Sequence, residues 1–141
     1  MTKGQLTDID RLEIVRYRLE KAERTYNEAM GAVANGYAET AANRLYYAAY
    51  YAVSALLVAY KHEASTHNGV IQMFGMAFIK TSVVDKCYGK IYNQLFSLRL
   101  TGDYEDRHIV DMGAEILPLV DPAKRLIDKV SEMAMEKMNL K

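Results

Sequence analysis

The segment LRLTGDYEDRH, from Leu98 to His108, holds the residues of this sequence that are best suited to phosphate or proton-transfer chemistry. Arg99 comes first, and Asp103, Tyr104 and His108 follow it. A guanidinium group matches the geometry of a phosphate, and an imidazole can move a proton near neutral pH. Such a pair could cleave RNA without a metal, with the imidazole withdrawing the 2′-hydroxyl proton and the cation stabilising the charged phosphorane. An ion pair between Arg99 and Asp103 that only stabilises a helix end explains the same spacing, and spacing alone favours that structural explanation.

Two further polar residues, Arg44 and His67, lie near predicted helix ends and are candidates for binding RNA or a nucleotide. The sequence contains no glycine-rich phosphate loop, no H-E-x-x-H, no paired cysteines and no nucleophile elbow. We therefore expect neither a metal nor a cofactor. The single cysteine, Cys87, excludes an internal disulfide and suits a reducing compartment.

Length and composition indicate one globular domain spanning residues 1–141. Half of the residues are apolar and 26% are charged, which is typical of a folded chain. The 18 basic and 18 acidic residues give a net charge of zero, so phosphate binding requires a local basic patch. The charged N-terminal segment does not resemble a signal peptide, and we expect a cytoplasmic location.

The spacing of apolar residues predicts an all-α protein, an antiparallel bundle of about five helices. The first two helices are expected near Asp8–Val33 and from Tyr37 to about Lys61. Thr7 or Asp8 is expected to cap the start of the first helix, and Asn35-Gly36 to stop it in a left-handed conformation. Thr66 and Asp85 are expected to cap the third and fourth helices, and Thr101-Gly102 to end the fourth, with a polar turn after it. The last helix is expected to start at Asp121 with Pro122 in its first position, or earlier, near Met112, with a kink.

The stretch Thr40–Tyr60 carries a stripe of alanines beside a stripe of large residues that includes Tyr46 and Tyr50, and its only charge is Arg44. A helix that is apolar around most of its circumference belongs in the middle of a bundle. Alanine and tyrosine are too weakly apolar for a membrane span, so we expect no membrane contact. Buried packing, with a subunit interface, explains the tyrosines better than a platform for stacking RNA bases.

Three stretches together resemble the HEPN family of small helical domains. They are NRLYYAAYYAVSALL at residues 43–57, STHNGV at residues 65–70 and RLTGDY at residues 99–104. The resemblance implies an antiparallel helical bundle, commonly a homodimer, with the polar motif of each subunit in a cleft at the interface. It also implies relatives that are metal-independent ribonucleases or toxins, often encoded beside a nucleotidyltransferase partner.

The catalytic motif of the active members is an arginine followed, after four to six residues, by a histidine, which would make Arg99 the phosphate-binding residue. Here four residues separate Arg99 from Tyr104, and eight separate it from His108. Two hypotheses remain open. One is a dimeric module of a toxin–antitoxin pair that binds RNA, nucleotide phosphates or a nucleotidyltransferase, with Arg44, Arg99 and Tyr104 lining the cleft. The other is an active endoribonuclease that uses Arg99 with His108 or His67.

Overall fold

The computed structural model describes residues 6–104 and 111–140, with only the backbone for residues 101–104. All of its regular structure in these residues is helical, which confirms the all-α prediction. The elements are α1 (Asp8–Ala34), α2 (Ala38–Ala59), α3 (His67–Phe74), the π-helical turn η1 (Gly75–Ile79), α4 (Lys86–Tyr104) and α5 (Met112–Met138).

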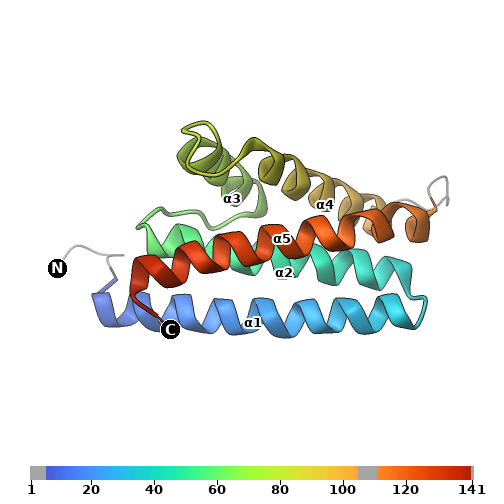
Figure 1. Cartoon of the computed structure of the whole chain (residues 1–141), viewed down its shortest axis with the longest axis horizontal. Coiled ribbons are helices and arrows are strands. Elements are labelled where there is room, and N and C mark those ends of the chain that lie inside the picture. The colour runs from blue at the N-terminus through green and yellow to red at the C-terminus, as the bar shows by residue number, and fades with distance from the viewer. Residues whose placement is uncertain (1–5, 105–110, 141) are drawn as a thin grey trace.

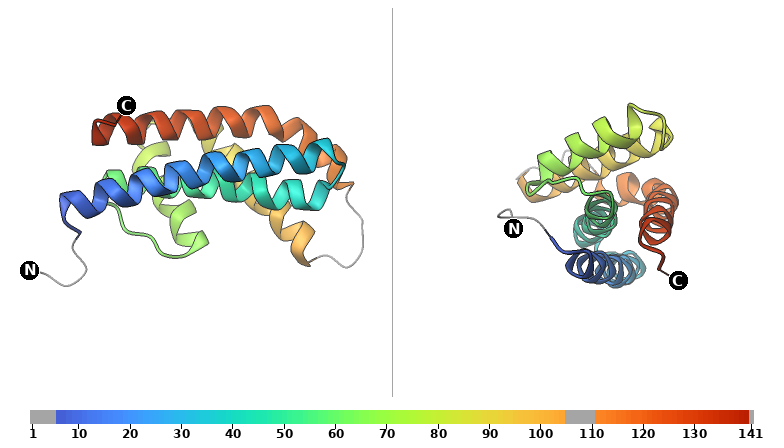
Figure 2. Two further views of the ribbon diagram at one scale, coloured as in Figure 1. Left: turned by 90° about the horizontal axis from the view of Figure 1, so that it is seen from below. Right: turned by 90° about the vertical axis from the view of Figure 1, so that its left-hand side faces the viewer.

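Helix α2 lies in the middle of the bundle and contacts α1, α3, α4 and α5. Figure 2 shows this arrangement end-on, with α1 on one side of α2 and the shorter α3 on the other. Helices α1 and α2 run antiparallel and are joined by a tight turn at Gly36, where φ is 76°. Glycine adopts this left-handed conformation without steric cost, so the predicted stop at Asn35-Gly36 is confirmed.

The central position of α2 follows from its small side chains. Thirteen of its 22 residues are buried, and the following alanines among them are at most 2% exposed: Ala41, Ala42, Ala48, Ala49, Ala52, Ala55 and Ala59. Side chains this short let the backbones of neighbouring helices approach closely on several sides of α2. In the described residues, no helix is both long enough and apolar enough to cross a membrane.

Hydroxyl and carboxylate side chains cap the helices where the sequence predicts them. The Thr7 hydroxyl accepts a hydrogen bond from the Asp10 amide at 3.0 Å, and that of Thr66 accepts one from the Gly69 amide at 2.9 Å. Before α4, an Asp85 carboxylate oxygen accepts a hydrogen bond from the Cys87 amide at 2.9 Å. Each cap satisfies a backbone donor that the first turn of a helix leaves without a partner.

The predicted end of the fourth helix at Thr101-Gly102 is wrong, because α4 continues to Tyr104. Glycine inside a helix costs only about 1 kcal/mol relative to alanine, so Gly102 does not by itself stop the helix. Leu95 and Leu98 are buried in the same helix, and packing against α2 and α5 outweighs this local preference.

The favoured start of the last helix at Asp121 is also wrong, and the earlier alternative holds. Helix α5 begins at Met112, and an oxygen of Asp111 accepts a hydrogen bond from the Ala114 amide at 3.1 Å. Met112 and Ile116 are buried, and burying a side chain of this size stabilises the fold by about 1.5–3 kcal/mol. A proline inside a helix costs about 3 kcal/mol, and α5 contains both Pro118 and Pro122, so these two contacts offset a large part of that cost. Pro118 lies on an exposed part of α5, where water can bind the carbonyl that loses its helical donor.

The start of α5 can be tested by removing each of the two possible caps. We expect Asp111→Ala to lower the free energy of unfolding by about 1 kcal/mol, since it deletes a side-chain cap. Asp121→Ala, at an exposed position inside the helix, should leave stability unchanged within about 0.5 kcal/mol. Urea denaturation followed by circular dichroism measures both values. A larger loss in Asp121→Ala than in Asp111→Ala would contradict the observed helix start.

Candidate functional site

The ring of Tyr47, in the first half of α2, is the shared neighbour of three polar side chains. The guanidinium carbons of Arg44 and Arg99 each lie 5.3 Å from its centroid, and the His67 ring centroid lies 5.6 Å from it. These residues belong to α2, α4 and α3, so the fold brings together groups that are far apart in sequence. We call Arg44, Tyr47, His67 and Arg99 the Tyr47 site.

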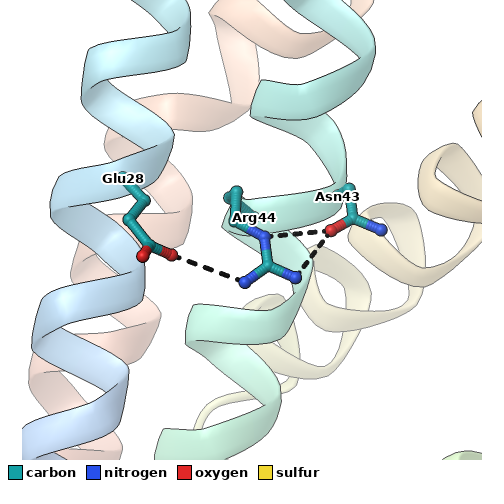
Figure 3. A network of polar contacts seen from close by, with 3 residues as sticks. All are labelled: Glu28, Asn43 and Arg44. Atoms are coloured by element: carbon teal, nitrogen blue, oxygen red, sulfur yellow. Dashed lines mark hydrogen bonds and ion pairs between the residues drawn. The ribbon is translucent and has the colours of Figure 1, made fainter.

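Arg44 is held at this site by two neighbours, as Figure 3 shows. Its Nε and Nη2 donate hydrogen bonds to the Asn43 side-chain oxygen at 3.0 and 2.8 Å. Its Nη1 forms an ion pair with Glu28 of α1 at 3.4 Å. The Glu28 side chain is 61% exposed, and an ion pair so open to solvent contributes about 0–1 kcal/mol. A stronger anion can therefore compete with Glu28 for the guanidinium.

Arg99 lies over two tyrosine rings of α2. Its guanidinium carbon is 5.5 Å from the centroid of Tyr46 and 5.3 Å from that of Tyr47. A cation over an aromatic face gains about 0.5–2 kcal/mol, depending on how far it is desolvated. The contact fixes the charge of α4 against the aromatic surface of α2. Arg99 is half-buried, so its position is determined by packing as well as by charge.

His67 is the first residue of α3 and is placed by the Thr66 cap directly before it. Its Nδ1 lies 2.8 Å from the hydroxyl oxygen of Tyr46, and its ring centroid is 4.6 Å from that of Tyr50. Burial among these rings lowers the pKa of His67 below its usual value of 6.5, and the positive charge of Arg99 lowers it further. The imidazole is therefore neutral at pH 7.

The partner of this imidazole, Tyr46, is fully buried and remains protonated. Burial raises its pKa to about 12, although the nearby Tyr92 hydroxyl and the charge of Arg99 oppose that rise. Two tautomers of His67 fit the 2.8 Å contact. If Tyr46 donates to Nδ1, then Nε2 carries a proton and can donate to a ligand. If Nδ1–H donates to Tyr46, then Nε2 is an acceptor and can act as a base.

The structure brings together the three residues that the sequence nominated for binding, namely Arg44, His67 and Arg99. The catalytic candidate His108 lies outside the described residues. Asp103 and Tyr104 form part of the backbone of α4, but their side chains also lie outside the described part of the chain.

Sequence reasoning missed Tyr47 as part of the site and Tyr46 as the partner of His67, because it interpreted the tyrosines of this helix as packing residues. Tyr46 is indeed in the core, with its side chain fully buried. Tyr47 is only partly buried and follows Arg44 by three residues, a spacing that places two side chains side by side on one helix face. That spacing was the signal available in the sequence. The contacts of Tyr46 with His67 and of Tyr47 with Arg99 depend on the tertiary fold and have no local signal.

By its fold and site, the protein is a helical bundle with a tyrosine-rich central helix on which polar side chains converge. The chain matches the HEPN domain family over residues 15–137. It is 35% identical over 122 residues to a UPF0332 protein of Thermotoga maritima, in an alignment that covers 82% of this chain and 92% of that protein. It is 28% identical over 131 residues to a Methanocaldococcus jannaschii protein named "Putative toxin", covering 93% of this chain and 96% of the relative. The chain therefore belongs to the HEPN domain family, as its three sequence stretches indicated.

The electrostatic contact between Arg99 and His67 makes a measurable prediction. Since burial and Arg99 lower the pKa of His67, we expect it to titrate below pH 6.5 in the folded protein and closer to 6.5 in Arg99→Gln. Proton NMR of the imidazole Cε1–H signal measures both values. Arg125→Gln, which removes an exposed arginine of α5, is the control and should leave the titration unchanged.

The lowered pKa of His67 also determines how the stability of the fold changes with pH. Between the folded pKa of His67 and about 6.5, the unfolded chain binds more protons than the folded chain. The stabilisation from neutral His67 is therefore complete above pH 6.5 and is lost as the pH falls toward the folded pKa. An unchanged His67 titration in Arg99→Gln would show that the two groups do not interact.

Proposed function

We propose that this HEPN protein binds single-stranded RNA at the Tyr47 site, as the RNA-directed component of a toxin–antitoxin pair. The observation that supports this most directly is the convergence of Arg44, Arg99 and His67 on the ring of Tyr47. The name of the M. jannaschii relative supports the toxin context. The resemblance to HEPN proteins supports a nucleotidyltransferase as the protein partner, with the antitoxin role.

The chemistry of the site suits a single strand of RNA. Such strands bind proteins through phosphate contacts with cations and through stacking of bases on aromatic rings. Arg44 and Arg99 supply two cations next to one ring, and neutral His67 supplies a further hydrogen-bonding group. Tyr50 is also only partly buried, and it extends the aromatic surface along α2. The zero net charge of the chain requires that binding be local in this way.

Salt-dependent RNA binding tests the proposal. We expect Arg44→Gln and Arg99→Gln each to weaken binding of a single-stranded RNA by about tenfold, or about 1.4 kcal/mol. Each should also reduce the slope of log K against log salt by about 0.7, because one phosphate contact is lost. Glu28→Gln should strengthen binding, since it removes the carboxylate that competes for Arg44. Fluorescence anisotropy measures all of these constants.

The matched control for this series is Lys90→Gln, which removes an exposed cation from α4 away from the Tyr47 site. It should leave both the affinity and the salt slope unchanged. Equal losses in Lys90→Gln and Arg99→Gln would mean that binding is diffuse, and the Tyr47 site would then have no special role.

A second candidate function is metal-independent RNA cleavage at the same site, favoured by the neutral imidazole of His67 beside the charge of Arg99. In this reaction Nε2 of His67 removes the 2′-hydroxyl proton, and the 2′-oxygen attacks phosphorus. The bond from phosphorus to the 5′-oxygen breaks, and that oxygen takes up a proton. The products are a 2′,3′-cyclic phosphate and a 5′-hydroxyl, and Arg99 stabilises the negative charge on the phosphorane.

Incubation of the purified protein with RNA and a chelator separates binding from cleavage. Binding alone leaves the RNA intact, whereas catalysis yields cyclic-phosphate ends that disappear in Arg99→Gln. His67→Asn and His108→Ala then identify the base, since only the variant that lacks it should lose cleavage while still binding RNA. Cleavage that persists in Arg99→Gln would remove the Tyr47 site from the reaction.

We also propose that the functional unit is a homodimer. Tyr51 keeps part of its surface open on α2, and Tyr17 of α1 is 54% exposed. Lys21 lies over the rings of both Tyr17 and Tyr51, so these aromatic side chains belong to one continuous surface.

Light scattering should give twice the chain mass of 16.0 kDa at micromolar concentration. A mass of one chain would contradict the dimer.

A further inference from the structure

The start of α1 and the end of α2 lie at the same end of the bundle (Figure 1). A second cationic site is formed there by residues of both helices and of the loop after α2. The structure has a cavity of about 710 Å³ there. Its lining includes three cationic side chains, Arg11, Arg18 and Lys61, and one carboxylate, Glu63. We call it the end cavity. The end cavity shares no residue with the Tyr47 site, although Ser54 of its lining is about 10 Å from Tyr47 along the axis of α2 at 1.5 Å per residue, and Ser65 precedes His67 by two residues.

The two arginines project from the same face of α1, because seven residues correspond to nearly two helical turns. Arg11 is held in place by a hydrogen bond from its Nη1 to the Val58 carbonyl at 2.8 Å. Its Nε is buried and has no hydrogen-bond partner among the side chains and backbone that the structure describes. A buried guanidinium nitrogen without an acceptor is unfavourable, and because Nε has almost no exposed surface, a bound anion would stabilise the Arg11 charge through the rest of its guanidinium group.

Lys61 occupies a backbone position at which most proteins place glycine. Helix α2 ends with the hydrogen bonds Lys61 N–H to Val58 O at 3.0 Å and His62 N–H to Leu57 O at 2.9 Å. This pattern requires a left-handed residue directly after the helix, and Lys61 has φ of 64°. A side chain is strained there, whereas glycine is not. The lysine therefore lowers stability at this position and contributes a charge to the end cavity.

The C-terminal end of a helix carries partial negative charge, which would ordinarily repel an anion. At the end of α2 the carbonyl of Leu57 accepts a hydrogen bond from the His62 amide, and that of Val58 accepts from the Lys61 amide and from Arg11. These bonds satisfy two of the last carbonyls of the helix, those of Leu57 and Val58. The remaining balance of three cations against Glu63 favours an anion.

We propose that the end cavity binds the phosphate groups of a small phosphorylated molecule. The charge excess suits a multiply charged phosphate better than a single carboxylate, and a guanidinium matches phosphate geometry with two parallel donors. The volume is in the range of about 300–1,000 Å³ that holds small-molecule ligands. This inference is independent of RNA binding at the Tyr47 site.

The test uses inorganic pyrophosphate as the probe and the whole chain labelled with ¹⁵N. Pyrophosphate at millimolar concentration should shift the backbone amide signals of residues 62–65 in a saturable manner. Arg18→Gln and Lys61→Gly should each weaken this binding by about tenfold, as expected for loss of one charge-assisted contact. Glu63→Gln should strengthen it. Lys61→Gly should also keep or raise the thermal midpoint, since it relieves the strained backbone, so lost binding in that variant cannot come from unfolding.

Three controls match these variants. Ser82→Gly relieves another left-handed residue, with φ of 63°, and should leave pyrophosphate binding unchanged. Arg24→Gln removes an exposed arginine of α1 that does not line the end cavity and should also have no effect. Arg99→Gln should keep the shifts at residues 62–65, so the end cavity and RNA binding can fail separately.

Three results would overturn the proposal. The first is the absence of saturable shifts at residues 62–65 with pyrophosphate. The second is equal binding by wild type and Lys61→Gly. The third is binding of malonate as strong as that of pyrophosphate, because the end cavity would then recognise carboxylates instead of phosphates.

Discussion

Close packing around the alanines of α2 is the constraint on which the rest of this structure depends. Alanine loses almost no side-chain entropy on burial and keeps helix axes close, so one helix can be surrounded by four others. The cost is a shortage of apolar area, since alanine buries little surface. Large residues beside the alanines, such as Tyr46, Leu45 and Leu56, supply that area and are fully buried. The fold therefore needs both the stripe of alanines and the neighbouring stripe of large residues on α2. A larger residue in place of one of these alanines would push the neighbouring helices apart.

The tyrosines of α2 divide between two roles because successive helical residues point in different directions. Tyr46 points into the core, where its ring stacks on that of Tyr92 at 6.0 Å and its hydroxyl reaches His67. Tyr47, the next residue, lies at the edge of the core and contacts Arg44 and Arg99. A buried ring thus fixes the histidine, and a half-buried ring fixes the arginines. The geometry of the Tyr47 site is in this sense a product of core packing.

Local sequence signals predicted which helices form better than they predicted where each helix begins and ends. Apolar residues at steps of three and four, with Thr7 and Thr66 as caps, indicated α1 and α3 correctly, because these signals act within one or two turns. The start of α5 could not be read in this way, since Asp121-Pro122 is as good a local start as Asp111. Burial of Met112 and Ile116 decides between them, and burial depends on the other helices. The same reason applies to the site: the spacing of Arg44 and Tyr47 is visible in the sequence, whereas the approach of Arg99 and His67 requires the fold.

The distribution of charge on α2 explains why a chain with no net charge has two separate cationic places. From Ala48 to Leu57 most of α2 is buried, and an unpaired charge there would be strongly unfavourable. Most of the charged groups that contact this helix lie toward its ends, with Arg44 and Arg99 at one and Lys61 and Arg11 at the other, whereas Lys21 contacts its middle over the ring of Tyr51. Both groups are partly desolvated by the aromatic or helical surface beside them, which strengthens their interaction with an anion relative to the same charges in open solvent. The buried middle of α2 therefore favours phosphate recognition near the two ends of this helix, where the two groups of cations share no residue.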